Sequence, residues 1–399
     1  MAIRRPVRHD DRPSHAPDYL LLTVVLLLSV IGIIAVYSAS YALGEREFKD
    51  PNYFVKRQAI FMVAGLLIMA VTMRLPYHML ARLSPLVMFA ALAGLALVLM
   101  PGIGFEQNGA RSWIRIGGLP PLQPSEFAKF GVIVYLAAWL TAKGDQLKDF
   151  SLGVLPFVTM VGLVAALIMF EGDLGTTIVV GAITGTLFFI AGARVTHTLA
   201  LAGVAGLAFT VLMMTGDQYR MDRLTSFLNA EADPQGAGFH TLQLLVAFGS
   251  GGIDGLGLGV SRQKFFYVPG SHTDGVLAII GEELGFIGTC VVLGLFMVLL
   301  ARGWMIVKRA DGQFGSLMAA GILAWIAFQT LINVGGVTRL MPLTGIPLPF
   351  VSYGGTALLA IFAATGVLLS ISRYTLEEVE ARAPVQQARR PAPTLGGAR

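Results

Sequence analysis

Charged residues are scarce in this 399-residue chain. Asp, Glu, Lys and Arg together make up 13% of it, whereas soluble proteins carry about 25%. Hydrophobic residues account for 55% of the chain, and its mean hydropathy is +0.70. This balance excludes an ordinary soluble protein and indicates one that crosses a membrane several times.

Cysteine is almost absent, since Cys290 is the only one. A single cysteine excludes an intrachain disulfide. The sequence also lacks a Ser-His-Asp order, a Walker phosphate loop and a Cys/His metal spacing. We therefore predict no metal site from a ligand motif. The isoelectric point near 9.4 does not indicate a nucleic-acid partner, because most cations flank apolar runs, where they set membrane topology.

Apolar runs of about 20 residues, the length that crosses a bilayer, recur along the chain. They predict an all-α polytopic membrane protein with about ten transmembrane helices and a large outer loop between helices seven and eight. The predicted spans are 18–41, 57–74, 79–100, 124–142, 152–170, 174–192, 197–214, 275–301, 315–335 and 354–372.

The expected domain organisation is one membrane domain, 18–373, between two cytoplasmic segments. The first, 1–17, is basic, and the second, 374–399, has a composition typical of disorder. An even number of spans puts both termini on one side, and basic inner loops make that side the cytoplasm. The outer loops hold an excess of cations that suits a bound anion: Arg46, Arg111, Arg115, Arg220, Arg223, Arg262, Lys264 and Arg339.

Three carboxylates around the start of the span 275–301 stand out. Glu282 and Glu283 lie inside the apolar run, where charge is costly and often functional; the alternative is pairing with a basic group from another helix. Asp274, just before the helix, is either an N-cap or a functional carboxylate. Helical spacing puts a row of small residues near the face of Asp274, which favours close packing or a groove: Ala278, Gly281, Gly285 and Gly288.

Further polar groups gather on the outer side. Glu126 and Lys129 share a helix face, as a local cap and ion pair or as a polar wall for an anionic headgroup. Arg262 and Lys264 come just before a run of aromatic residues, which suits interfacial anchoring or contact with a pyrophosphate. Near the outer end of another span, Gln329 and Asn333 are four residues apart on one face.

Taken together, the motifs resemble the SEDS family (shape, elongation, division and sporulation proteins). The matching stretches are NGARSWI with QPSEFAK, DLGT, GSGG with GLGLGVSRQKFFYVPGSHTD, GEELGFIG, and PLTGIPLPFVSYGG, and they span nearly the whole chain. SRQKFFYVP and IGEELG are more similar to the division branch, FtsW, than to the elongation branch, RodA. The chain departs from the family at Gly275, usually aromatic, at Glu171-Gly172, usually Gln-Pro, and at Arg339, where a small residue is common.

The resemblance implies a peptidoglycan glycosyltransferase that polymerises lipid II at the outer face of the bacterial cytoplasmic membrane, for septal wall synthesis in cell division. The family's essential aspartate corresponds to Asp274, which would act as the general base of an inverting transfer. The substrate-binding candidates are Glu126, Lys129, Arg111, Arg262, Lys264, His272 and Glu282. Four of them, Arg111, Lys129, Arg262 and Lys264, could hold the leaving pyrophosphate.

Further expectations concern cofactors and partners. A divalent cation, Mg or Mn, could assist the reaction, although no ligand set is visible in the sequence. The implied partners are lipid II, a class B penicillin-binding protein transpeptidase, other division-complex proteins and membrane lipids. Two alternatives stay open: a lipid II flippase or transporter, and a scaffold without catalysis. Neither strong inverted repeats nor a polar path across the membrane, which a transporter would favour, is visible.

Overall fold

The computed structural model describes residues 15–107, 110–115, 117, 120–214 and 218–374. The basic segment before residue 15 and the tail after Tyr374 lie outside these residues. The described chain is nearly all helical, and each of the ten predicted spans corresponds to one helix. These helices are α1 (Tyr19–Phe48), α2 (Tyr53–Arg74), α3 (His78–Leu99), α4 (Pro124–Lys143), α5 (Leu155–Phe170), α6 (Leu174–Ile190), α7 (Val195–Met214), α10 (Val276–Arg309), α11 (Gly312–Val337) and α12 (Gly355–Ser372).

Length and composition agree with a membrane-spanning bundle. Within the described residues, eight helical segments are long and apolar enough to cross a membrane, and α6 and α7 are shorter apolar helices. Two short helical turns, η2 (Gly144–Lys148) and η3 (Phe150–Val154), connect α4 to α5. The prediction of an all-α polytopic membrane protein is therefore confirmed.

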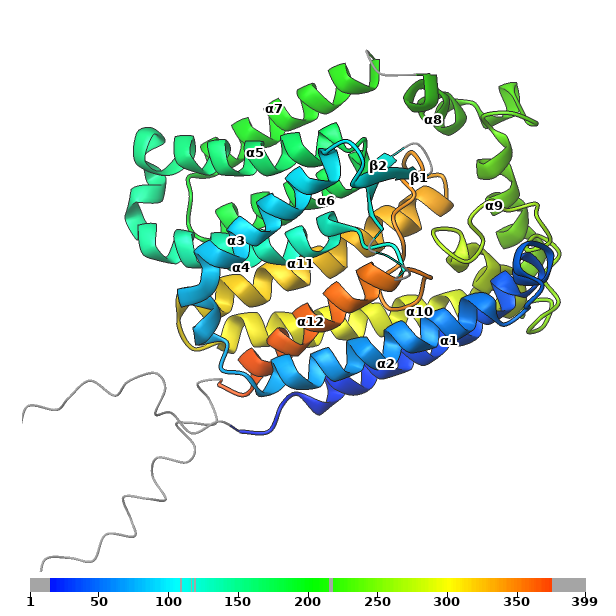
Figure 1. Cartoon of the computed structure of the whole chain (residues 1–399), viewed down its shortest axis with the longest axis horizontal. Coiled ribbons are helices and arrows are strands. Elements are labelled where there is room, and N and C mark those ends of the chain that lie inside the picture. The colour runs from blue at the N-terminus through cyan, green and yellow to red at the C-terminus, as the bar shows by residue number, and fades with distance from the viewer. Residues whose placement is uncertain (1–14, 108–109, 116, 118–119, 215–217, 375–399) are drawn as a thin grey trace, which may run out of the picture.

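The two ends of the bundle hold different parts of the chain. In Figure 1 the helices α1, α2, α10 and α12 run side by side along one edge, and α8 and α9 gather at one end of the molecule. At the opposite end the two limits of the described chain meet, because the backbone amide of His15 donates to the carbonyl oxygen of Arg373 at 3.0 Å. The long segment between α7 and α10 therefore lies far from both of these limits.

That segment holds more regular structure than its sequence predicted. Its first helix is α8 (Gln218–Leu228). A 3-10 turn, η4 (Ala230–Ala232), and a second helix, α9 (Phe239–Gly251), follow. Helix α9 packs on α10 where Gly251 and Gly281 bring the two backbones together, so a side chain at either position would clash. The segment is thus fastened to the bundle.

A small pair of strands lies between α3 and α4. Strand β1 (Gly104–Gln107) pairs antiparallel with β2 (Ala110–Ile114), with Phe105 opposite Trp113. Ile114 then bridges to Leu122, two residues before α4 begins. Backbone pairing between the two strands satisfies the polar groups of this stretch. The hairpin holds the start of α4 in place.

Helix α10 is broken at Gly285, which the prediction of one continuous helix missed. Gly285 has φ 66° and ψ −164°, a conformation that favours glycine. The break frees the carbonyl oxygens of Glu282 and Glu283, which accept from the amides of Leu256 and Gly257 at 2.9 Å. The glycine-rich segment around Leu256 and Gly257 is therefore hydrogen-bonded to the backbone of α10 at the break. The predicted row of small residues ends at Gly281, since the helix axis does not continue past the break.

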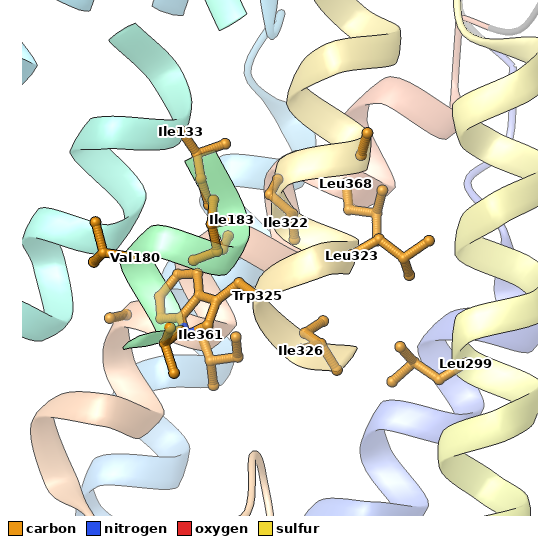
Figure 2. Close-up of a cluster of buried hydrophobic side chains, with 14 of the residues drawn as sticks. Ile133, Val180, Ile183, Leu299, Ile322, Leu323, Trp325, Ile326, Ile361 and Leu368 are labelled. Atoms are coloured by element: carbon orange, nitrogen blue, oxygen red, sulfur yellow. The ribbon is translucent and has the colours of Figure 1, made fainter. Parts of the chain in front are cut away.

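The apolar core lies where α4, α6, α11 and α12 meet. Figure 2 shows Trp325 of α11 beside Ile183 of α6, with Ile133 of α4 and Ile361 of α12 close by. All four side chains are buried. The indole Nε1 of Trp325 donates to Gln329 Oε1 at 2.7 Å, so this core directly supports a polar side chain one turn further along α11.

Candidate active site

Asp274 lies in a tight turn just before α10 and is 9% exposed. The amides of Thr273 and Gly275 both donate to the carbonyl oxygen of Gly270, which closes the turn. Gly270 has φ 64°, and a Cβ there would lie 2.5 Å from Asp274 Oδ1, so glycine is required. The N-cap of α10 is Gly275, and the hydroxyl of Thr273 donates to Asp274 Oδ1 at 2.9 Å. The carboxylate is therefore not the helix cap that the spacing allowed.

Helix α11 carries polar side chains that connect Asp274 to the neighbouring loop. Asn333 Nδ2 donates to the backbone oxygens of Asp274 and Ile346, each at 2.9 Å. One turn earlier, Gln329 Nε2 donates to the carbonyl oxygen of Pro347 at 3.0 Å. Both side chains are buried. The predicted shared face of Gln329 and Asn333 thus faces the loop 342–354 and the start of α10.

Lys129 and Glu126 of α4 lie next to Gln329. We call Glu126, Lys129, Gln329, Asn333 and the turn of Asp274 the polar line. Lys129 Nζ lies 2.8 Å from Glu126 Oε1 and 3.2 Å from Gln329 Oε1. The ammonium also lies 5.0 Å from the centre of the Trp325 ring. The lysine and glutamate side chains are only 1% and 4% exposed. A fully exposed pair on the helix surface is therefore excluded, and a charged pair sits inside the bundle beside Gln329.

A second buried network surrounds the break in α10. Glu282 accepts from the amides of Arg262 and Gln263 at 2.9 and 3.3 Å, and from the hydroxyl of Ser261. Glu283 pairs with Lys264 at 2.8 Å and accepts from Ser38 of α1 at 2.6 Å. A basic partner was expected on another helix, whereas Lys264 comes from the preceding loop. Glu282 and Lys264, two substrate-binding candidates, are both taken up by protein groups.

The other substrate-binding candidates are spread around the polar line. Arg111 donates to the carbonyl oxygens of Gly104 and Met100 at 3.2 and 3.0 Å, which ties β2 to the end of α3. His272 packs between Phe54 and Tyr353, with ring centres 4.6 and 5.4 Å away. Burial lowers the pKa of His272 from 6.5 to about 4. Arg262 keeps an exposed side chain beside Glu282.

A third carboxylate, Glu171, lies between α5 and α6. It is 1% exposed, and neither carboxylate oxygen has a hydrogen-bond partner within the described residues. Burial, and secondarily the charge of Asp173, raise the pKa of Glu171 from 4.5 to about 9. Asp173 caps α6 through the amide of Thr176 at 2.9 Å and accepts from Gln123 at 3.2 Å.

These residues do not suit a divalent cation. Asp173 already serves Thr176 and Gln123, and Glu171 is raised in pKa rather than held as an anion. Among the residues that the structure places, no three of His, Cys, Asp and Glu gather into a group that could hold a metal ion.

Two further groups belong to this region: Arg223, one of the outer cations, and His240, which the sequence did not single out. Arg223 of α8 donates to the carbonyl oxygen of Thr344 at 3.1 Å, in the loop that Asn333 also binds. His240 of α9 is influenced by the charges of both Asp274 and Arg223. The sequence pattern does not place α9 against the start of α10, because its docking depends on glycine contacts far apart in the chain.

The fold and the site define a multi-span membrane protein with charged and amide side chains buried below one end of the bundle. A family model, FTSW_RODA_SPOVE, described as "Cell cycle protein", matches residues 18–377. The chain therefore belongs to this family, the SEDS family that its motifs predicted.

Relatives of known name agree. The chain is 45% identical over 361 residues to stage V sporulation protein E of Bacillus subtilis, covering 90% of this chain and 98% of the relative. It is 41% identical over 355 residues to a probable peptidoglycan glycosyltransferase FtsW of Trichlorobacter lovleyi, covering 89% and 93%. The expected similarity to FtsW is therefore confirmed.

Solved structures share the fold. A chain from work titled "Structural coordination of polymerization and crosslinking by a peptidoglycan synthase complex" matches with a TM-score of 0.74 and 28% identity, covering 90% of this chain and 98% of that one. The rod shape determining protein RodA of Thermus thermophilus matches with a TM-score of 0.67 and 28% identity, covering 90% and 99%. Almost the whole described bundle is thus shared with both.

Proposed function

We propose that this chain is a peptidoglycan glycosyltransferase that polymerises lipid II into glycan strands, with Asp274 as the general base. The observation that carries the proposal is the buried line from Glu126 and Lys129 through Gln329 and Asn333 to the turn of Asp274. Buried charge inside an apolar bundle is costly, and a functional role explains its presence. The names of the FtsW relatives support the same activity.

The chemistry is an inverting sugar transfer. A hydroxyl oxygen of the acceptor sugar bonds to the anomeric carbon of the donor, while the bond from that carbon to the diphosphate oxygen breaks. The electron pair leaves with the undecaprenyl diphosphate, and the hydroxyl proton passes to the carboxylate of Asp274. The Asp274 carboxylate receives only the Thr273 hydroxyl among the described hydrogen bonds, so it retains capacity to accept this proton.

Cations near the line would stabilise the charge that develops on the leaving diphosphate. Lys129 is the first candidate, because it is buried beside the line and its partner Glu126 has an unpartnered oxygen, Oε2, among the described residues. Arg262, which is exposed, is the second. Arg111 and Lys264 rank lower because backbone carbonyls and Glu283 already occupy them. We propose a shaping role for Glu282 and His272 in the walls of the site.

A class B penicillin-binding protein transpeptidase is the proposed partner. The support is the similarity to a chain from a complex that couples polymerization and crosslinking. No described part of this chain forms a separate soluble domain that could crosslink the product. Septal wall synthesis, together with other division-complex proteins, is the proposed setting because FtsW relatives recur among the matches.

The proposed location is the bacterial cytoplasmic membrane, with the site at the outer face and both termini in the cytoplasm. We retain the proposed division into a basic segment 1–17, a membrane domain 18–373 and a tail 374–399. Supporting this orientation, the end of the bundle where His15 meets Arg373 also carries Arg302, which pairs with Asp18 at 2.7 Å. Basic groups at that end are typical of the cytoplasmic side.

The test is reconstitution of the purified chain, alone and with its native transpeptidase, in liposomes containing lipid II. We expect glycan polymer on a gel and more of it with the partner. A parallel assay follows flipping of fluorescent lipid II between leaflets. Flipping without polymer would establish the transporter instead, and neither activity with or without the partner would favour a scaffold.

A further inference from the structure

His240 of α9 lies against the turn that holds Asp274. Helices α9 and α10 run in the same direction where they pack together. Leu244 lies beside Gly275, Phe248 lies beside Gly281, and Gly251 lies beside Gly281 and Glu282. Residues four apart share a helix face. His240, one turn before Leu244, therefore lies level with the residues just before Gly275.

Gly275 makes this close approach possible. A Cβ at Gly275 would lie 3.0 Å from Val268 Cγ1 and 3.4 Å from Leu244 Cδ2, so a large side chain has no room. The turn of Asp274 and the first turns of α9 are thus in direct contact. This is also a position where the chain departs from its family, since an aromatic residue is usual there.

The charges around His240 come from few groups. Burial lowers the pKa of His240, the negative charge of Asp274 raises it, and Arg223 lowers it. Helix α9 has no other titratable side chain. On the elements packed against it, Glu231 of η4 pairs with Arg339, and Glu282 and Glu283 of α10 are bound in their own network. The Nε2 atom of His240 is buried without a partner among the described residues.

We propose that His240 is the proton-accepting partner of Asp274, a positioning residue that acts through the carboxylate and not on the substrate. The proposal rests on the proposed function. During transfer, the acceptor hydroxyl proton moves to Asp274 as the new glycosidic bond forms and the diphosphate leaves. Asp274 then passes this proton to the free nitrogen of His240, and the resulting imidazolium loses it to water or to the departing diphosphate. Asp274 returns to its ionised form for the next transfer.

A neutral imidazole is required for this role. Because burial is the main influence on His240, the ring is uncharged at neutral pH and able to accept a proton. In acid the ring is already protonated and cannot relieve Asp274. The rate of polymerisation should therefore show an acid limb that depends on His240.

The experiment compares His240→Gln with the wild type in the reconstituted polymerisation assay across pH 5 to 8. Gln keeps a polar side chain of similar length but cannot carry a proton. We expect kcat at neutral pH to fall about 100-fold, the lower end of what a positioned acid–base group contributes. KM should stay near the wild-type value, and the acid limb should shift. The matched control is His197→Gln on α7, a histidine outside the site, which should keep the wild-type profile.

Added imidazole provides a second readout, because it should partly restore a His240→Ala variant if proton transfer is what was lost. A wild-type rate and profile in His240→Gln would overturn the proposal. So would a lower rate with an unchanged acid limb and no rescue, which is the behaviour of a purely structural histidine. Should these variants not fold, the imidazole titrations of the six histidines in folded Asp274→Asn decide the matter. One pKa must fall relative to wild type, and six unchanged values would overturn the proposal.

Different results would count against the proposed function and against the role of His240. If the wild type makes no polymer, or Asp274→Asn polymerises normally, the assignment of the base is wrong whatever His240 does. If Asp274→Asn is inactive and His240→Gln is normal, only the proton-accepting role is lost.

Discussion

Two buried lysine–glutamate pairs, both 2.8 Å apart, behave differently in this molecule. We call Lys129–Glu126 the open pair and Lys264–Glu283 the closed pair. In the open pair, Glu126 Oε2 and the neighbouring Ser125 hydroxyl have no partner among the described residues. In the closed pair, both oxygens of Glu283 accept from Ser38, and Lys264 also contacts that hydroxyl. We propose that this unused hydrogen-bonding capacity makes the open pair available to substrate, whereas the closed pair holds the fold.

Of the changes considered, breaking the open pair should have the largest effect, and that effect should be a loss of polymerisation activity. Lys129→Met removes a cation from the proposed site, so polymerisation should fall about 10²–10³-fold, as when one electrostatic stabiliser is lost. The double change Glu126→Gln with Lys129→Met removes the unpaired buried charge. It should recover thermal stability in detergent but not polymerisation. Near-normal glycan synthesis in a folded double variant would make the open pair structural.

Breaking the closed pair should act on stability. Glu283→Gln leaves Lys264 buried and unpaired, which typically costs about 3–5 kcal/mol. Adding Lys264→Met removes the stranded charge, so the double variant should regain most of its stability and also its polymerisation rate. Unfolding in denaturant or heat, followed by tryptophan fluorescence, measures the first effect. A stable but inactive double variant would contradict the distinction between the two pairs.

His272, a buried neutral side chain outside both pairs, should make the stability of the protein depend on pH. Its pKa is lowered by burial to about 4, so between pH 6.5 and 4 the unfolded chain binds a proton that the folded chain resists. Stability present above pH 6.5 is therefore lost as the pH falls, by about 3 kcal/mol in full. His272→Phe, which can still pack with Phe54 and Tyr353, should lose less stability between pH 7 and 4. Parallel melting curves for the two proteins would disprove the assignment.

Glu171 belongs to neither pair and should have the smallest effect. Its pKa is raised to about 9, so above pH 4.5 the unfolded chain releases a proton that the folded chain keeps. Stability is therefore lost as the pH rises from 4.5 towards 9. Glu171→Gln should stabilise the protein by roughly 1–3 kcal/mol at pH 8 and by little near pH 4. A destabilising effect at pH 8 would show that the carboxylate has a partner in the folded protein.

Much of the fold could be predicted because bilayer-length apolar runs are a strong local signal. Each predicted span became one helix, with ends shifted by up to eight residues. The break in α10 could not be predicted, because GEELG reads as helix, and only the pairing of Leu256 and Gly257 with the freed carbonyls makes Gly285 a break. Helix α9 was not predicted for a similar reason, because it packs on α10 through residues far away in the sequence.

The site could be predicted in part. Motif resemblance singled out Asp274, Glu126 and Lys129, and the structure places Lys129 and Asp274 near the same face of α11. Pairings could not be predicted, because residue types do not tell which carboxylate Lys264 meets. Lys264 and Glu282 were both expected at the substrate, and both are used to hold the loop before Asp274.

The most direct test of the account is the glycan output of Asp274→Asn. Asn keeps the size of the side chain and can keep its contact with Thr273, but it cannot accept a proton as a carboxylate does. We predict a folded protein that binds lipid II and its transpeptidase with wild-type affinity while polymerising about 10²–10⁴-fold more slowly. Polymerisation by folded Asp274→Asn at the wild-type rate would contradict the central claim that this carboxylate is the base.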